Sequence, residues 1–179
     1  QDIVKYSDHG KYDTLVALLG DPSFTRVIIF GAMKHSVEKL GIELTRSGIK
    51  AESIHGNKNH GQRQRALQGF KDGRVRVLVA TDVAARGIHV DDVSHVINYD
   101  LPNTFEDYLH RIGRTGRGSK RGKALTFVPD AHAQEVREHR AHPQGEASGT
   151  RVGRRPYEGS RPYTPRAPRA HGGDQGNRG

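Results

Sequence analysis

The sequence predicts an α/β protein in which a mostly parallel sheet is covered by helices on both faces. Short apolar runs alternate with longer amphipathic stretches along residues 26–128. Strands and helices that alternate at this spacing are joined by right-handed crossovers, which produce a parallel sheet between helical layers. Near residue 141 the composition changes and apolar residues almost vanish. We therefore expect a folded domain over residues 1–140 and a separate segment over residues 141–179.

Five strands are expected, and each is a run rich in Val, Ile, Leu or Ala. They cover residues 26–30, 51–55, 76–80, 94–99 and 122–128. Polar residues follow several of these runs, among them Thr81, Asp82 and Asp100. Ligands of parallel sheets bind beyond the carboxyl ends of the strands, so a site is expected at that edge.

The helices are expected between these strands. They cover residues 11–19, 35–46, 60–70 and 131–140, with a short helical turn at 83–86 and a further helix that begins near Thr104. Thr104 is a suitable N-cap because Asp107 stands at the third helical position. In the second helix, the side chains expected to face the sheet are Val37, Leu40, Ile42 and Leu44.

Composition favours a polyanionic partner. The formal net charge is +9, the pI is near 10.0 and the mean hydropathy is −0.76. Among polyanionic partners, nucleic acid is the first candidate for a chain with this excess of positive charge, and an anionic membrane is the second. No apolar run is long enough to span a bilayer and no signal peptide is visible, so we expect no membrane partner. The absence of cysteine excludes disulfides and fits a reducing cytoplasm. Because residue 1 is Gln, we expect a piece of a longer protein.

The stretch from Asp107 to Arg117 is the most distinctive motif. It places Arg111, Arg114 and Arg117 three residues apart, with glycines between them. This spacing gathers the side chains on one side of a helical turn, where three guanidiniums repel one another unless an anion joins them. Planar guanidinium forks suit phosphate oxygens. The plainer alternative is a solvated basic helix end.

The segment 141–179 is rich in Pro, Gly, Arg, Ser and Tyr and contains no lysine. Such a composition cannot bury enough apolar surface to offset its ordering entropy, so we expect disorder. Arginine beside tyrosine suits contacts with phosphates and unpaired bases. The residues expected to bind RNA here are Arg154, Arg155 and Arg161. The alternative is a flexible segment that only keeps the chain soluble.

Several motifs together resemble one family. Val27–Phe30, His55–Lys58 with Arg63, Val77–Gly87 and His110–Arg117 occur in the order seen in DEAD-box RNA helicases. The sequence resembles the second, C-terminal RecA-like domain of that family, and among its subgroups the RhlE type. The resemblance covers about residues 1–130. It implies a RecA-like three-layer α/β/α fold.

The resemblance also implies an ATP site shared between two domains. In the family, ATP and Mg²⁺ are held mainly by the N-terminal RecA-like domain, and the C-terminal domain closes over them. Arg114 and Arg117 would then be catalytic arginine fingers toward the γ-phosphate. The positions implied to contact the nucleotide are Gly87, His89, Arg114 and Arg117. His110 and Arg111 would couple the two domains, although a structural ion pair is an equal alternative for Arg111.

The same resemblance implies contacts with the RNA sugar-phosphate backbone. The matching positions are Lys34, His60, Arg63 and Thr81. A hydroxyl and nearby backbone N–H groups can bind a phosphate without reading a base. The alternatives are a strand-end cap for Thr81 and a solvated helix charge for Arg63.

Three positions depart from the family pattern. His60 stands where the family usually has Gln, and Met33 where Thr is common. His89 stands where an Asp usually helps to hold the ribose. A neutral imidazole offers one hydrogen bond but no carboxylate charge. We therefore expect His89→Asp to tighten nucleotide binding in a full-length enzyme.

The chain contains no Walker loop, no Asp-Glu-Ala-Asp box and no Ser-Ala-Thr motif. We therefore expect no ATP hydrolysis from it alone. The eleven histidines are scattered, and no metal site is expected. The leading interpretation is the C-terminal half of an ATP-dependent RNA helicase with a basic tail. The alternatives are an RNA-binding or chaperone module that acts through the tail, and a DNA-directed helicase.

Overall fold

A computed structural model of the chain describes residues 2–7, 10–86, 88, 90, 92–115 and 122–130. Six strands form one sheet in the order β1-β6-β5-β2-β4-β3, and all neighbouring strands run parallel. They are β1 (Asp2–Tyr6), β2 (Val27–Phe30), β3 (Ala51–Ile54), β4 (Val77–Ala80), β5 (His95–Asn98) and β6 (Lys123–Pro129). The expected α/β fold with a parallel sheet is confirmed.

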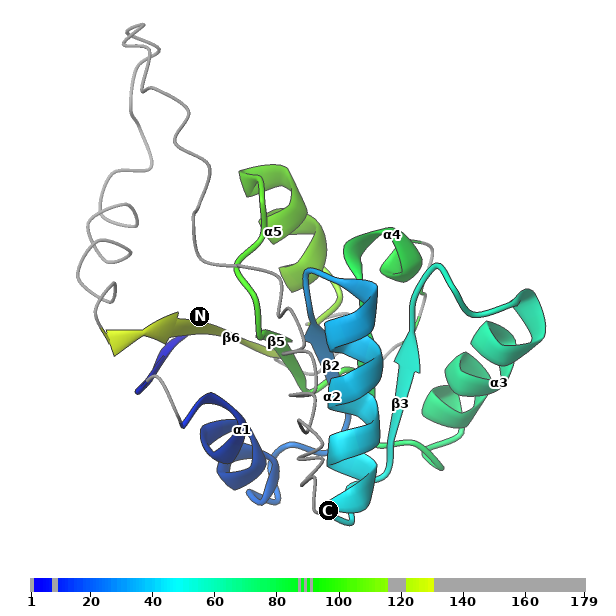
Figure 1. Ribbon diagram of the computed structural model, residues 1–179, viewed down its shortest axis with the longest axis horizontal. Helices are drawn as coiled ribbons and strands as arrows, with labels where there is room; N and C mark the ends of the chain where they lie inside the picture. Colours follow the sequence, from blue (N-terminus) through cyan, green and yellow to red (C-terminus); the bar gives the residue numbers. More distant parts are fainter. Residues whose placement is uncertain are drawn as a thin grey trace, which may run out of the picture. The chain divides into compact units, whose positions relative to one another are not determined.

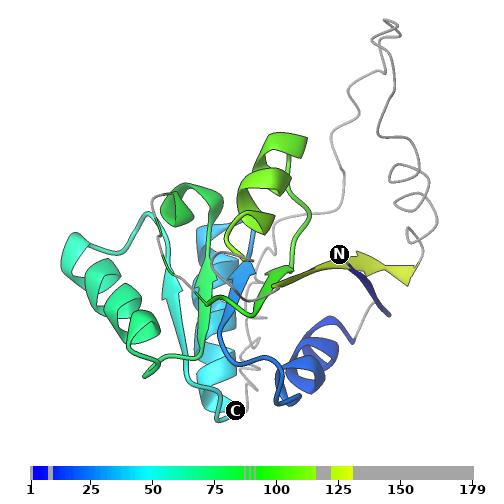
Figure 2. The same cartoon turned by 180° about the vertical axis from the view of Figure 1, so that it is seen from behind.

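Helices cover both faces of this sheet (Figures 1 and 2). They are α1 (Lys11–Leu19), α2 (Lys34–Arg46), α3 (His60–Lys71), α4 (Asp82–Ala85) and α5 (Phe105–Ile112). Side chains of α1 and α2 pack in one apolar cluster, and side chains of α3 and α4 pack in a second cluster across the sheet. The result is the expected three-layer arrangement.

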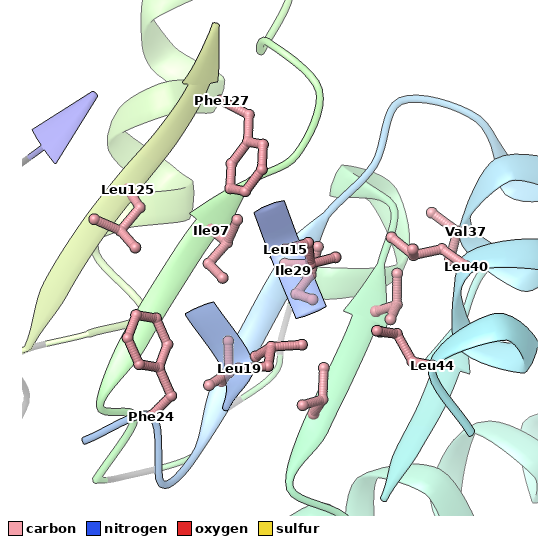
Figure 3. Packing of buried hydrophobic residues seen from close by; sticks show 13 residues of the cluster. Leu15, Leu19, Phe24, Ile29, Val37, Leu40, Leu44, Ile97, Leu125 and Phe127 are labelled. Atoms are coloured by element: carbon pink, nitrogen blue, oxygen red, sulfur yellow. The ribbon is translucent and has the colours of Figure 1, made fainter. Parts of the chain in front are cut away.

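The central strands explain why two clusters form. In β2, Val27 and Ile29 belong to the cluster of α1 and α2, whereas Ile28 and Phe30 belong to the cluster of α3 and α4. Successive side chains of a strand point to opposite faces, so a continuous apolar run is buried on both. Figure 3 shows the first cluster. Each fully buried Leu or Ile contributes about 1.5–3 kcal/mol, which makes the sheet a rigid support for its loops.

Strand β1 was not expected from the sequence. It pairs only with β6 among the described strands, with Asp2 opposite Leu125 and Tyr6 opposite Pro129. Asp2 and Lys5 are exposed and Ile3, Val4 and Tyr6 are half-buried, as is common for a strand at the edge of a sheet. A run of only five residues, two of them charged, gives a weak strand signal, and its pairing partner lies more than a hundred residues away.

The expectation for Ile42 was wrong. Its side chain is 44% exposed, whereas Val37, Leu40 and Leu44 are buried against the sheet. At 3.6 residues per turn, Ile42 lies about 150° around the helix from the centre of that apolar stripe. Gly41 occupies the inward position instead. A Cβ on Gly41 would lie 3.2 Å from the Cβ of Ser53, so α2 packs closely on β3.

The other helices and strands begin and end within two residues of the expected bounds. Thr104 caps α5, since its Oγ1 accepts a hydrogen bond of 3.0 Å from the backbone N–H of Asp107. The helix expected over 131–140 and the segment 141–179 lie outside the described residues.

Candidate functional site

The candidate site lies at the carboxyl-end edge of the sheet, where α4 and α5 are also found (Figure 1). Asp100, just beyond β5, ties the loops of this edge together. Its carboxylate accepts hydrogen bonds from the backbone N–H of Ala32 at 2.9 Å and from Lys11 Nζ at 2.8 Å. The loop after β2 and the start of α1 are therefore held to the end of β5.

Arg111 is buried at this edge, and its side chain is only 2% exposed. Its Nε and Nη2 donate to the two carboxylate oxygens of Asp82 at 2.6 and 2.7 Å. Its Nη1 donates to the backbone carbonyl of Asp100 at 2.7 Å and to Asn98 Oδ1 at 3.3 Å. The guanidinium also lies 5.1 Å from the ring centre of Phe30.

These contacts make Arg111 the centre of a network that joins α5 to the first residue of α4 and to the end of β5. A bidentate pair between arginine and carboxylate fixes both orientation and distance. Removal of one partner of a buried pair costs about 3–5 kcal/mol because the other charge remains buried. The structure thus places Arg111 in an ion pair, the alternative that the sequence left open, and any role in domain coupling stays a prediction.

Arg114 follows the C-terminal end of α5. Its Nη1 donates a hydrogen bond of 2.8 Å to the backbone carbonyl of Ile88, in the segment after α4. Thr115 Oγ1 donates to the backbone carbonyl of Val93 at 3.1 Å, which anchors the same turn. A narrow pocket separates α4 from α5, and it is lined by Phe30, Asp82, Ala85, Arg86, Asp107, His110, Arg111 and Arg114. This arrangement collects four basic side chains and two carboxylates around one opening.

His110 stands at the rim of this pocket. Its side chain is largely exposed, and its Nε2 lies 4.0 Å from Glu106 Oε1 on the preceding turn of α5. The other predicted site residues near the motif, Gly87, His89 and Arg117, lie outside the described residues. The same holds for Arg154, Arg155 and Arg161. Their roles remain predictions.

Three of the basic residues predicted to bind RNA belong to α2 and α3. Lys34 opens α2, and its Nζ donates to Asn57 Oδ1 at 3.1 Å in the loop after β3. His60 and Arg63 lie one turn apart on α3, and both are exposed. The N-terminus of α3 is fixed by a capping box in which Asn59 and Gln62 exchange two hydrogen bonds of 2.9 Å. The loop between β3 and α3 is therefore well anchored.

Thr81 lies between β4 and α4. It is half-buried, and its backbone N–H donates to the carbonyl of Ile54 at 3.3 Å. Although Thr81 occupies the N-cap position of α4, its side chain makes no capping hydrogen bond. The structure thus gives no support to a capping role for the hydroxyl.

A cluster around Glu38 was not anticipated from the sequence. Its Oε2 accepts hydrogen bonds from Ser53 Oγ and, at 2.9 Å, from His55 Nε2. Lys58 Nζ lies 3.3 Å from the same oxygen. The backbone N–H of Asn57 donates to His55 Nδ1 at 3.3 Å, which leaves Nε2 as the protonated nitrogen of a neutral ring.

The charge of Glu38 is strongly favoured in this cluster. The hydrogen bond from Ser53 lowers the pKa of Glu38 most, and His55 and Lys58 add to the effect, so the pKa falls to about 2. Ser53 and His55 are both buried, while Glu38 remains partly exposed. Glu38 therefore links α2 to the end of β3 and to the loop that leads to His60 and Arg63. Only the tertiary packing of α2 on β3 reveals this partnership.

No group of three His, Cys, Asp or Glu side chains that could hold a metal ion occurs among the described residues. None of the helices that the structure describes is long and apolar enough to cross a membrane.

Residues 10–119 match the family described as the helicase conserved C-terminal domain. Among solved structures, the fold is similar to the Escherichia coli DEAD-box protein SrmB bound to regulator of ribonuclease activity A, with 41% identity and a TM-score of 0.70. That match covers 75% of this chain and 79% of the SrmB chain. The chain belongs to the DEAD-box helicase family, as a C-terminal helicase domain.

Other DEAD-box proteins show the same relationship. The helicase domain is 35% identical to the solved C-terminal domain of Dbp5, with a TM-score of 0.67 and coverage of 77% and 80%. It is 47% identical over 128 residues to the ATP-dependent RNA helicase CshA of Listeria monocytogenes, a match that covers 72% of this chain. It is 43% identical over 136 residues to the ATP-dependent RNA helicase RhlB of Pseudomonas syringae, covering 76% of this chain. The chain spans only 25% and 34% of these two relatives.

Proposed function

We propose that this domain is the C-terminal half of an ATP-dependent RNA helicase and supplies arginine fingers to ATP held by the N-terminal RecA-like domain of the same protein. The observation that supports this best is the position of Arg114 at the opening between α4 and α5, held by the Ile88 carbonyl. The ion pair of Arg111 and Asp82 fixes the two helices around it.

The residues of this edge fit a triphosphate by their chemistry. ATP supplies the phosphoryl group that is transferred to water, while Mg²⁺ is held by the N-terminal domain. In this proposal Arg114 and Arg117 would neutralise charge at the γ-phosphate, and Gly87 and His89 would contact the nucleotide. When ATP binds, Arg114 would donate to phosphate oxygens in place of the Ile88 carbonyl, because hydrogen bonds to a charged acceptor are stronger.

The RNA strand is bound through its backbone by Lys34, His60, Arg63 and Thr81. Phosphate contacts carry no sequence information, so binding is independent of sequence and falls steeply as salt is raised. Closure of two domains on one strand bends it and separates short duplexes. We further propose that the protein is of the RhlE type and cytoplasmic.

Turnover measurements test the proposed function. The 179-residue chain alone should hydrolyse no ATP above background, with or without RNA. A protein that joins it to a matching N-terminal RecA-like domain should show RNA-stimulated ATP turnover. The proposal would be wrong if the isolated chain showed RNA-stimulated turnover or if the joined protein were inactive while both domains were folded.

The segment 141–179 supports a second candidate function, because its arginines and tyrosines suit contacts with RNA. In this alternative the segment acts as an RNA-binding or chaperone module without catalysis. RNA affinities of residues 1–140 and of the whole chain, measured by fluorescence anisotropy, separate the two. Loss of all binding on truncation would identify the segment as the module, whereas unchanged binding would identify the folded domain.

A further inference from the structure

A second hollow opens at the amino-end edge of the sheet, opposite the edge that carries the candidate site. Its volume is about 580 Å³, and it is bordered by the residues that precede β2, β3 and β4. Ligand pockets typically have volumes of about 300–1,000 Å³. The proposed helicase function makes no use of this hollow.

Three cationic residues occupy neighbouring backbone positions along this edge. β3, β4 and β2 are neighbours in the sheet, and the residues just before them are Lys50, Arg76 and Arg26. The backbone N–H of Arg76 donates to the Lys50 carbonyl at 2.8 Å, and the N–H of Val27 donates to the Arg76 carbonyl at 3.0 Å. The three positions are therefore separated by single strand spacings of about 4.8 Å. Asp92 is the one carboxylate among the lining residues, which leaves the lining with a formal charge of +2.

Both arginines are oriented by the ends of helices, and these two helices lie on opposite faces of the sheet. Arg76 Nη2 donates to the carbonyl of Leu19, the last residue of α1, at 2.7 Å. Arg26 Nη2 donates to the carbonyl of Lys71, the last residue of α3, at 3.4 Å. These bonds are favourable because cations complement the negative end of a helix. They give the arginines a structural role, but they do not account for Lys50, which is exposed at the same hollow.

The rim of the hollow is kept open by two glycines. Gly48 follows α2 and Gly73 follows α3, and both have left-handed backbone angles, with φ of 79° and 76°. A Cβ at either position would meet no heavy atom within 4 Å. The N–H groups of both glycines donate to carbonyls of the preceding helices, Gly48 to Thr45 at 3.0 Å and Gly73 to Phe70 at 3.3 Å, so an anion in the hollow would be bound by the cationic side chains.

From the basic lining and the volume of the hollow, we infer that it binds an anion with at least two phosphate groups, which the separated guanidiniums can contact from different sides. Arginine forks held in place lose little entropy when they bind phosphate oxygens. Lys50 adds a mobile charge that can follow the second group. The anion is either a free oligophosphate or a stretch of RNA backbone. The inference is independent of the proposed helicase function, because it concerns the opposite edge of the sheet.

Nuclear magnetic resonance of the full 179-residue chain tests this inference at the level of single residues. Tripolyphosphate is titrated into the ¹⁵N-labelled chain, and the amide signals of Gly48 and Gly73 report on the hollow. A single-stranded RNA oligonucleotide is titrated in parallel. Both amides should shift in a saturable way with tripolyphosphate. A shift with RNA as well would identify RNA backbone as a source, and a shift with tripolyphosphate alone would identify a free oligophosphate; either supports the inference.

The variant Lys50→Glu reverses the charge of an exposed side chain and should leave the fold intact. It should weaken tripolyphosphate binding at Gly48 and Gly73 roughly fivefold or more, because one attractive charge becomes repulsive. Lys39→Glu is the matched control, since Lys39 is exposed on α2 and does not line the hollow. The inference is overturned if tripolyphosphate shifts neither amide, or if the two variants bind it equally well.

Discussion

Arg111 on α5 and Asp82 on α4 form a bidentate ion pair, with N–O distances of 2.6 and 2.7 Å. The pair ties together two segments that lie almost thirty residues apart in the chain. Because Arg111 also donates to the Asp100 carbonyl and to Asn98 Oδ1, each of its three nitrogens has an acceptor. The loops that carry the candidate site thus share one anchor.

Replacement of this anchor should strongly destabilise the fold. Arg111→Ala leaves the Asp82 carboxylate, which is 24% exposed, and the buried Asn98 side chain without this partner, so the free energy of unfolding should fall by about 3 kcal/mol, the lower end of the range for buried pairs. Urea titration followed by circular dichroism measures the change. Arg86→Ala is the control, because Arg86 is exposed and lies 4.0 Å from Asp107, and it should cost less than about 1 kcal/mol. Equal losses in both variants would contradict a special role for the buried pair.

Arg114 should matter for catalysis far more than for stability. In the protein joined to its N-terminal RecA-like domain, Arg114→Ala should lower kcat for ATP by roughly 10³-fold or more, as for other arginine fingers. The loss of one hydrogen bond to the Ile88 carbonyl should change the unfolding free energy by only about 1 kcal/mol. Arg74→Ala, at an exposed position far along the chain from the motif, is the control. A kcat within threefold of the parent would exclude Arg114 as a finger.

Glu38 should make the stability of the domain depend on acid pH. Its pKa falls from 4.5 to about 2 in the folded state, so the folded state binds fewer protons than the unfolded state between these values. The stabilisation is fully present above pH 4.5 and is lost as the pH falls toward 2. Since Glu38 is partly exposed, solvent screening reduces this contribution to about 1 kcal/mol.

Chemical unfolding between pH 6 and 3 measures this effect. The parent chain should lose more stability over this range than Glu38→Gln, in which the carboxylate is already absent. Glu52→Gln serves as the control, because Glu52 is exposed on the neighbouring strand β3. Parallel pH profiles for the parent and Glu38→Gln would show that Glu38 does not carry the effect.

His89 is the position where a single substitution should improve binding. In the joined protein, His89→Asp should tighten nucleotide binding, because a carboxylate accepts hydrogen bonds from ribose hydroxyls better than a neutral imidazole. A titration with a fluorescent ATP analogue measures the dissociation constant. His35→Asp, which changes another histidine of the chain in the same way, controls for the added negative charge. Unchanged or weaker binding by the His89 variant would refute the prediction.

The sequence predicted the central strands β2 and β4 well because both are continuous apolar runs, a pattern that can be seen without knowledge of the neighbouring strands. It missed β1, whose strand character comes from its pairing with β6. The prediction that Ile42 faces the sheet was also wrong. Ile42 is apolar, but its position along the helix places its side chain on the side of α2 that faces away from Val37, Leu40 and Leu44. The inward position belongs to Gly41, which carries no hydropathy signal.

The residues of the candidate site likewise include some that the sequence predicted and others that it did not. The composition of the motif from Asp107 to Arg117 is enough to predict an anion site. The network of Glu38 with Ser53, His55 and Lys58 has no such signature, because its members are ordinary residues on α2, β3 and the following loop. Likewise, Lys50, Arg76 and Arg26 are single cations in the sequence. Only the strand order β3-β4-β2 makes them neighbours.

The pairing of β1 with β6 has a consequence for biosynthesis. Asp2 pairs with Leu125, so β1 leaves the ribosome long before its partner exists. By then β2, β3, β4 and β5 have been made and can assemble the centre of the sheet. Closing so long a loop costs entropy that must be offset by contacts already formed. The N-terminal strand of this sheet is therefore among the last to be paired, and until then its backbone N–H and C=O groups lack their partners in β6.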